Sequence, residues 1–465
     1  MAEYMTPDTS VTKEKAPSVS GSGILNSKAE IGEVMDASDL EKRNHDGPGD
    51  KFHRLGWKRL TVIMVVEAIA LGSLSIPQAL ASLGMVPGVI ICVSLGLVAI
   101  YTSFVVGQVK LAYPHISHYA DAGRLLMGKF GYELVGIMFS LQLIFLVGSH
   151  SLTGAIAFGS ITNHGTCSIV FGIISAIILL LLAIPPSFAE VAILGYIDFV
   201  SVVLAIGITI IGTGVAQARG NLVASDWSAW PREGLTFVEA FVSLGNIVFA
   251  YSYAVCQFSF MDEMHTPKDY TKSIYVLGGI EIFVYNLTGI LIYLFVGSSV
   301  ESPALLSAGP TLSKIAFGVA LPVIFISGSI NTTVVTKYIH GRIYKNSTNR
   351  FINTRSGWIS WVGMVSLVTL IAWIIAESIP FFSDLLSISS CLFVSGFTFY
   401  FPSWMWFKLI KKGSWKSREN ILYSIINACV FVLGMIILFC GTYASIHDIL
   451  NQYAAGKVRG VFTCA

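Results

Sequence analysis

The residues best suited to binding chemistry lie in the middle of an apolar segment, LTVIMVVEAIALGSLSIPQALASLG, at residues 60–84. Its centre holds Gly72, Ser73, Ser75 and Pro77, which are residue types that weaken a helix. Pro77 has no backbone N–H, so one hydrogen bond of a helix would be missing there. If the segment spans a membrane, each unpaired backbone group costs several kcal/mol unless it faces protein, water or a ligand. The stretch therefore predicts either a packing defect or the binding site of a polar ligand.

The composition indicates a chain embedded in a lipid bilayer. Of its 465 residues, 54% are hydrophobic and 12% are charged, and the mean hydropathy is +0.71, whereas a soluble globular chain carries about 25% charged residues. The net charge of +2 gives no indication of a nucleic-acid partner. The seven cysteines form no Cys-x-x-Cys pair and no metal-binding spacing, and no phosphate-binding P-loop is present. We therefore expect a polytopic membrane protein that is not an enzyme, uses no metal or cofactor and is not driven by ATP.

The apolar runs predict an all-α membrane protein with eleven spans. They are expected at 58–83, 87–111, 131–158, 168–184, 188–216, 237–260, 273–298, 311–336, 357–378, 381–407 and 420–446. Residues 1–50 are rich in Ser, Asp, Glu, Lys and Gly, which predicts a disordered tail. The expected organisation is thus a cytosolic tail at 1–50, a transmembrane domain at 51–446 and an external C-terminal tail at 447–465.

Lys and Arg indicate the orientation of the spans, because they collect on the cytosolic side. With the N-terminus in the cytosol, nineteen basic residues lie at the cytosolic ends and connections. The outer side then holds five, namely Arg219, Arg232, Lys314, Lys457 and Arg459. We therefore expect the C-terminus to lie outside.

Two cysteines, Cys167 and Cys464, fall in segments on the predicted outer side. That side is oxidising, so a disulfide between them is one alternative. Two free thiols are the expectation that we favour.

A second interruption is predicted in span six, which contains NIVFAYSYAVCQF at 246–258. No proline or glycine lies at its centre, so the residue types alone indicate a break only weakly. The position of this interruption is stronger evidence. Spans one and six are the first spans of two halves of five spans each, and because five is odd, the two halves have opposite orientations in the membrane. Interrupted spans at corresponding places in inverted halves point to the binding site of a transporter.

Three stretches together resemble a known family. They are ALGSLSIPQALASLGMVPGV at 70–89, SHYADAGRLLMGKFG at 117–131 and FAYSYAVCQFSFMDEMHTPKDYTKSI at 249–274. In this order they resemble the amino acid/auxin permease family, especially its fungal neutral amino acid permeases, and the resemblance runs from about residue 55 to 446. Tyr253 and Ala254 stand where many members carry Gly-His or a similar pair. The resemblance implies a LeuT-type inverted repeat of five plus five spans, with broken helices one and six and a peripheral span eleven.

In such a site the substrate carboxylate would bind backbone amides at 72–75, since half-helix N-termini carry free N–H groups and partial positive charge. The ammonium group would bind carbonyls freed in spans one and six. The substrate side chain would meet aromatic residues of span six and of span three. The candidate substrate-binding residues are Gly72, Ser73, Leu74, Ser75, Phe249, Ala250, Tyr251, Ser252, Tyr253 and Phe145.

Ionisable groups inside the membrane are candidates for ion coupling. Glu67 lies five residues before Gly72, and an acid in this place, where sodium-coupled relatives often carry Asn, suggests a proton site. Asp198 in span five and His150 in span three follow, although a lone histidine on an apolar helix is usually a core residue. Hydroxyls of span eight could bind an ion or simply join helices. The ion-coupling candidates are Glu67, Asp198, His150, Ser329 and Thr332, with Glu190, Glu281 and Asp384 ranked after them.

The function predicted from these patterns is secondary active uptake of neutral aliphatic or aromatic amino acids across the plasma membrane, coupled to protons. Three alternatives stay open. A sodium-coupled symporter would show sodium-dependent uptake. An exporter of the same fold would lie in the vacuolar membrane. A nutrient sensor would bind amino acids without transporting them.

Overall fold

The computed structural model describes residues 56–464 apart from 186–187, 220–224, 263, 346, 348–353 and 457–459, and the side chains of 188–194 are also outside the description. The tail expected at 1–50 and the side chain of Glu190 therefore lie outside the described residues. The structure is built from long apolar helices, which satisfy their backbone groups internally and can therefore cross lipid.

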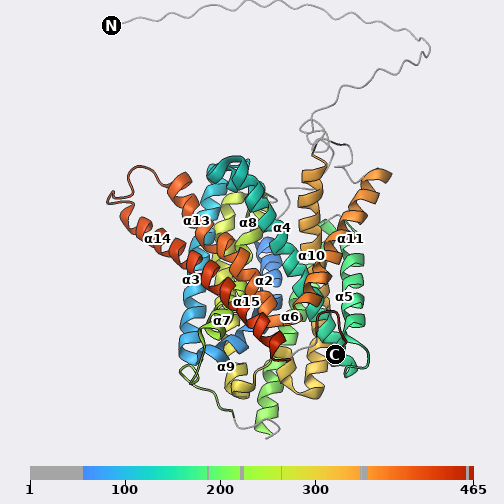
Figure 1. Cartoon of the computed structure of the whole chain (residues 1–465). Coiled ribbons are helices and arrows are strands. Elements are labelled where there is room, and N and C mark those ends of the chain that lie inside the picture. The colour runs from blue at the N-terminus through green and yellow to red at the C-terminus, as the bar shows by residue number, and fades with distance from the viewer. Residues whose placement is uncertain are drawn as a thin grey trace, which may run out of the picture. The chain divides into compact units, whose positions relative to one another are not determined.

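In the part of the chain that the structure describes, the helices form eleven successive segments (Figure 1). They are α2 (Trp57–Leu83), α3 (Met85–Ala112), α4 (Tyr119–Thr162), α5 (Ser168–Ala183), α6 (Phe188–Ala218), α7 with α8 (Phe237–Ala250 and Gln257–Asp262), α9 (Tyr270–Val296), α10 (Pro310–Ile343), α11 (Arg355–Ser378), α12 with α13 (Phe382–Ser389 and Phe401–Met405) and α14 with α15 (Ile421–Ile436 and Thr442–Ala454). In the described part of the chain, ten of these segments are long and apolar enough to cross a membrane, and α5, with 16 residues, is shorter. The expectation of an all-α membrane protein is confirmed.

Several helices are longer than the apolar runs indicate. Helix α4 begins at Tyr119 rather than at 131, and it bends at Gly128, whose φ of 66° is readily adopted by glycine alone. Helix α15 continues to Ala454, into the segment expected to be a tail from 447. Span ten passes through a π-helical stretch at Ser390–Tyr400, a widened form that is frequent at functional sites.

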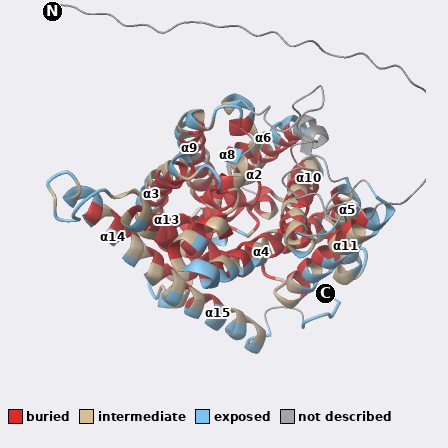
Figure 2. Ribbon diagram, turned by 90° about the horizontal axis from the view of Figure 1, so that it is seen from above, coloured by how far each residue is buried: buried red, intermediate tan, exposed pale blue. Residues whose placement is uncertain are grey.

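Helix α2 lies in the middle of the bundle, where buried residues surround it (Figure 2). In contrast, α11, α14 and α15 lie at the periphery and turn exposed apolar side chains outward, among them Ile359, Leu422 and Leu450. An apolar outer surface of this kind is suited to contact with lipid tails.

The predicted break in span one is wrong for this conformation, since α2 is one continuous helix from Trp57 to Leu83. The serine hydroxyls stay within the helix, because Ser73 donates to Ile69 O at 2.8 Å and Ser75 to Gly72 O at 3.0 Å. Pro77 removes one hydrogen bond but lies buried inside the helix, away from lipid. Packing around the stretch thus overrides its weak helix propensity.

The break in span six is present, although its residue types indicated it only weakly. Helix α7 ends at Ala250, and Tyr251, with φ −98° and ψ 38°, leaves the helical conformation. A short 3₁₀ turn at Tyr253–Cys256 then leads into α8. We call residues 251–256 the broken segment.

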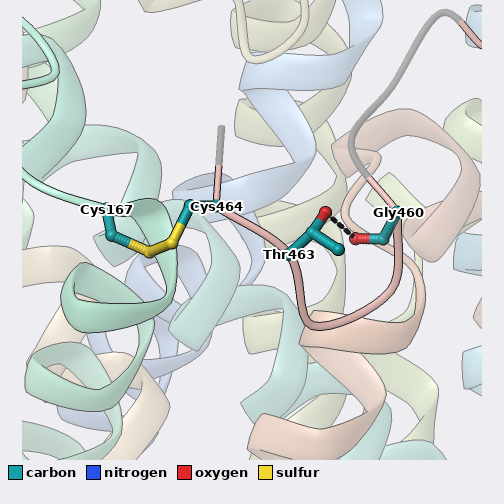
Figure 3. The surroundings of a disulfide bond; sticks show 4 residues. All are labelled: Cys167, Gly460, Thr463 and Cys464. Atoms are coloured by element: carbon teal, nitrogen blue, oxygen red, sulfur yellow. Dashed lines mark hydrogen bonds between the residues drawn. A yellow bond between two sulfur atoms is a disulfide. The ribbon is translucent and has the colours of Figure 1, made fainter.

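A disulfide joins Cys167, just before α5, to Cys464 near the C-terminus (Figure 3). Their Cα atoms are 5.0 Å apart, within the range that a disulfide spans. Thr463 next to it donates to Gly460 O at 2.7 Å, which shapes the terminal turn. The expectation of two free thiols is therefore wrong, because the chain beyond α15 returns to the start of α5.

We expect mass mapping of non-reduced peptides to recover Cys167 linked to Cys464. Replacing Cys464 by Ser should lower the free energy of unfolding by roughly 2–4 kcal/mol, because the bridge restricts the unfolded chain. A thermal unfolding measurement with and without reductant checks this, and Cys429→Ser, at an exposed free thiol, is the matched control. Equal melting temperatures for Cys464→Ser and the wild type would contradict a stabilising bridge.

Candidate functional site

A cavity of about 30 Å³ lies between α2, α4 and the broken segment. It is lined by Met64, Glu67, Ala68, Leu71, Gln142, Leu143, Leu146, Phe249, Ser252, Tyr253, Val255, Cys256 and Phe260. A water molecule needs roughly 10–15 Å³ measured in this way, so the cavity has room for about two waters. An amino acid is larger, and the cavity must widen before one can enter.

The cavity brings together four of the predicted residues, Glu67, Phe249, Ser252 and Tyr253. A further polar residue of the lining is Gln142 on α4. Ser389 donates to Gln142 Oε1 at 2.9 Å, which fixes the orientation of the amide. A carboxyl group, an amide and a hydroxyl thus converge on an otherwise apolar space, as in typical small-molecule sites.

The predicted residues of α2, Gly72, Ser73, Leu74 and Ser75, are buried but do not line the cavity. Gly72 instead allows α2 to approach the end of α7, because a Cβ placed on it would lie 3.0 Å from Ala250 Cα and 3.0 Å from Tyr285 Oη. The stretch is therefore the contact point between spans one and six.

Tyr285 on α9 joins these two spans. Its hydroxyl lies 2.9 Å from Ala68 O and 3.0 Å from Ala250 O and can donate to either. Its ring packs edge to face against Tyr251, with ring centres 5.3 Å apart. The Tyr251 hydroxyl in turn contacts Cys92 Sγ at 3.4 Å. Ala250 and Tyr251 are thus held by packing and do not line the cavity.

Phe145, predicted to contact the substrate, also lies outside the cavity. Its ring packs against Phe393 with centres 5.6 Å apart, and the next residue, Leu146, lines the cavity instead. One residue along a helix turns the side chain by about 100°, and the apolar pattern of span three does not determine which residue faces inward.

The other ion-coupling candidates do not assemble with Glu67 in this conformation. Asp198 is fully buried on α6, and its carboxylate has no hydrogen-bond partner among the described residues. His150 is buried against Gly328 of α10. Ser329 and Thr332 donate to carbonyls of their own helix, Ile326 O at 2.8 Å and Gly328 O at 2.9 Å.

A polar network that sequence reasoning did not identify holds α8 to α3 and to the connection that follows α3. Lys110 binds Asp262 and also donates to the carbonyls of Pro114 and Ile116. Gln257 donates to Ser103 O at 2.7 Å. We call this set the α8 latch, and it lies at the predicted cytosolic end of span six. Its members are separated by about 150 residues, so no local pattern indicates it.

His118 adds a second contact to the same end, with Nδ1 2.9 Å from Ser259 Oγ. Burial lowers the pKa of His118 below its usual value, and the charges of Asp121 and Asp262 oppose this effect. The ring is therefore neutral at neutral pH. Because the folded-state pKa is lowered, the stability that depends on neutral His118 is present above its ordinary pKa and is lost as the pH falls.

We expect Lys110→Met to favour the opening of the cytosolic end. The substitution leaves Asp262 and two carbonyls without their partner, and a hydrogen bond to a charged group contributes roughly 1.5–3 kcal/mol. Labelling of Cys256, which lines the cavity, by a maleimide from the cytosolic side should therefore become roughly 10–100-fold faster. Lys272→Met, at an exposed ion pair with Asp269, is the matched control, and Cys256→Ser identifies the labelled site. Equal labelling rates in Lys110→Met and Lys272→Met would show that the α8 latch does not keep the cytosolic end closed.

Comparison with known proteins supports the predicted family. A family model described as transmembrane amino acid transporter protein matches residues 53–447. The chain is 59% identical to the N amino acid transport system protein of Neurospora crassa, over 93% of this chain and 92% of that protein. It is 24% identical to amino acid permease 2 of Arabidopsis thaliana, over 79% of this chain and 83% of that protein.

Solved structures show a similar fold. One of them is Mhp1, a nucleobase-cation-symport-1 family transporter, in a closed conformation with bromovinylhydantoin bound. The match covers 89% of this chain and 95% of the Mhp1 chain, with 14% sequence identity and a TM-score of 0.53. Its inward-facing conformation gives a TM-score of 0.51. This similarity confirms the expected LeuT-type fold, and the relatives and the fold are those of transporters, not enzymes. The chain belongs to the transmembrane amino acid transporter family.

Proposed function

We propose that the protein takes up neutral amino acids by secondary active transport in symport with protons. The observation that carries the proposal is the cavity at the broken segment, where Glu67 is the acid among mostly apolar and aromatic residues. The Neurospora crassa relative is named as an N amino acid transport system protein, which agrees with an amino acid substrate.

The broken segment supplies the backbone groups for the common part of an amino acid. Helical pairing is interrupted between Ala250 and the start of the 3₁₀ turn, and Ala250 O, which now accepts from the Tyr285 hydroxyl, would be freed when the two spans separate. The freed carbonyls suit an ammonium group and the freed amides a carboxylate. We propose that the amides of α2 at Gly72–Ser75 become free only when the helix opens around the substrate, since Pro77 and the serines already weaken it.

The apolar lining favours a neutral side chain. Phe249, Leu143, Leu146 and Phe260 surround the space next to Tyr253. No Lys or Arg lines the cavity to bind an acidic side chain. A charged substrate side chain would be desolvated there without a counter-charge, which is costly.

Glu67 is proposed to carry the coupling proton. The cavity lining provides no cation to balance an ionised Glu67, so in a dry cavity the protonated side chain is favoured. Binding of the proton and binding of the substrate then favour the same closed conformation, which couples the two. A sodium symporter stays the alternative, since the hydroxyls of Ser329 and Thr332 donate within α10 and keep oxygen lone pairs that can bind a cation.

We propose the plasma membrane as the location, with the N-terminus in the cytosol and the C-terminus outside. The disulfide near the C-terminus supports an oxidising outer side. A vacuolar exporter would satisfy the same observation, and a fluorescently tagged full-length chain distinguishes the two membranes.

Uptake by proteoliposomes with the pH and sodium gradients varied separately tests the function. We expect radiolabelled neutral amino acids to accumulate when the outside is acidic, whether or not sodium is present. Accumulation that requires a sodium gradient would identify a sodium symporter. Binding of amino acids without any flux would identify a sensor, and either result would overturn the proposal.

A further inference from the structure

Glu281 on α9 is a buried acid that does not line the cavity around Glu67. Its side chain is fully buried, and neither of its carboxylate oxygens has a hydrogen-bond partner among the described residues. None of the ion pairs found in the described part of the chain includes it. A fully buried acid without a partner is rare, because burial of an unpaired charge is strongly unfavourable.

Glu281 faces the broken segment. Tyr285, one helical turn further along the same face of α9, reaches Ala250 O at the break. The hydroxyl groups of Tyr251 and Tyr253 in the broken segment and of Tyr270 on its own helix lie within electrostatic range of the Glu281 carboxyl group. Glu281 therefore belongs to the contact between α9 and the interrupted span.

Tyr253 has an unused hydroxyl group. Its Oη is buried without a hydrogen-bond partner among the described residues, whereas Tyr270 Oη lies next to Ser103. Tyr253 also lines the cavity that contains Glu67. Its side chain thus lies at the cavity and within electrostatic range of Glu281.

No cation surrounds Glu281 in the described structure. Helix α6 meets α9 through Gly214 and Phe295, toward the outer end of α9, and the ion pair of Lys272 with Asp269 lies exposed at its start. Lys110 of α3 is bound to Asp262. The titratable groups that the packed elements turn toward this region are Glu67 from α2, Cys92 from α3, Tyr251, Tyr253 and Cys256 from the broken segment, and Tyr270 and Tyr285 from α9 itself. None of these groups is a cation, so an ionised Glu281 would be buried without a counter-charge while the segment stays packed.

We propose that Glu281 is a second proton-binding site of the transport cycle, located where α9 packs against the broken segment, and that it exchanges its proton only in cycles in which Glu67 exchanges its own. The proposal rests on the proposed proton symport. Glu281 takes a proton from water while the outer path is open and keeps it while the segment is packed against α9. When α8 and the broken segment move away, water reaches the carboxyl group, which releases the same proton toward the cytosol. No other reactant is needed, because the carboxyl group only gains and loses one proton.

Glu281→Gln keeps the size of the side chain and imitates its protonated form. In proteoliposomes we expect the rate of exchange of labelled for unlabelled amino acid to stay within about twofold of the wild-type rate. A twofold change corresponds to a difference in activation free energy below ~0.5 kcal/mol. The number of protons that cross with each amino acid, obtained from the reversal potential, should fall by one. Glu377→Gln, at a buried acid on the peripheral helix α11, is the matched control and should keep the wild-type ratio.

If Glu281→Gln does not fold, the variants Tyr253→Phe and Tyr270→Phe provide an independent test of the proposal. Each removes one hydroxyl group that would stabilise ionised Glu281, so both should move the pH dependence of uptake toward higher pH. The infrared band of a protonated carboxyl group should in addition be present in the wild type and weaker in Glu281→Gln. An unchanged proton ratio in Glu281→Gln, or unchanged pH profiles in both tyrosine variants, would overturn the proposal.

Failure of this proposal can be told apart from failure of the proposed function. If amino acids enter without protons in the wild type, the symport itself is wrong. If the wild type transports protons, Glu67→Gln abolishes this and Glu281→Gln retains the full ratio, only the role of Glu281 is wrong.

Discussion

Replacing Gly72 by Val should abolish amino acid transport while the protein still reaches the membrane. A Cβ at this position meets Ala250 and the Tyr285 hydroxyl at 3.0 Å, where α2 crosses the break in span six. Overpacking a core costs about 1–3 kcal/mol, and here the whole cost falls on the contact that aligns the two spans. A cost near the upper end of this range corresponds to a roughly 100-fold loss of transport. Radiolabelled uptake, normalised to surface expression, measures it.

Gly279→Val is the matched control, because Gly279 lies on α9 with nothing within 4 Å of its Cβ position. It changes the same residue type within the same bundle and should leave uptake close to the wild-type value. Wild-type affinity and uptake in Gly72→Val would mean that the contact between α2 and Ala250 is only a packing feature.

Replacing Glu67 by Gln should remove accumulation against a gradient and leave exchange largely intact. Gln imitates the protonated side chain, so the closed cavity can still form around the substrate. A group that cannot release its proton cannot link the proton gradient to transport. The accumulation ratio in proteoliposomes should fall to about one, and uptake should lose its pH dependence, both following from the lost proton exchange.

Accumulation by Glu67→Gln with the normal pH dependence would place the coupling proton elsewhere. Asp198 and then His150 would be the next residues to replace, since both are buried and have polar atoms without partners in the described residues.

The sequence predicts the spans and the family well, because the composition of lipid-crossing helices and the three family motifs are local features. It predicts the break in span six from its position in the repeat. It does not predict that α2 stays helical, since this depends on the burial of Pro77 and on the hydroxyl contacts of Ser73 and Ser75 inside the folded bundle.

The candidate site is predicted in part. Glu67 and Tyr253 line the same cavity, because the fold packs span one against the broken segment of span six. Phe145 is predicted to contact the substrate, but the neighbouring Leu146 lines the cavity. The sequence of an apolar helix gives little indication of which face turns inward. The α8 latch and the bridge between Cys167 and Cys464 join residues about 150 and 297 positions apart. Such pairs are brought together only by the tertiary structure.

The movement of protons caused by the amino acid itself is the most direct test of the symport. A neutral amino acid is added to wild-type proteoliposomes that contain a pH-sensitive dye, with equal pH and no sodium on both sides. The lumen should become acidic as the amino acid enters, and vesicles with Glu67→Gln should show amino acid exchange without acidification. Entry of the amino acid into wild-type vesicles with no change of luminal pH would contradict proton symport.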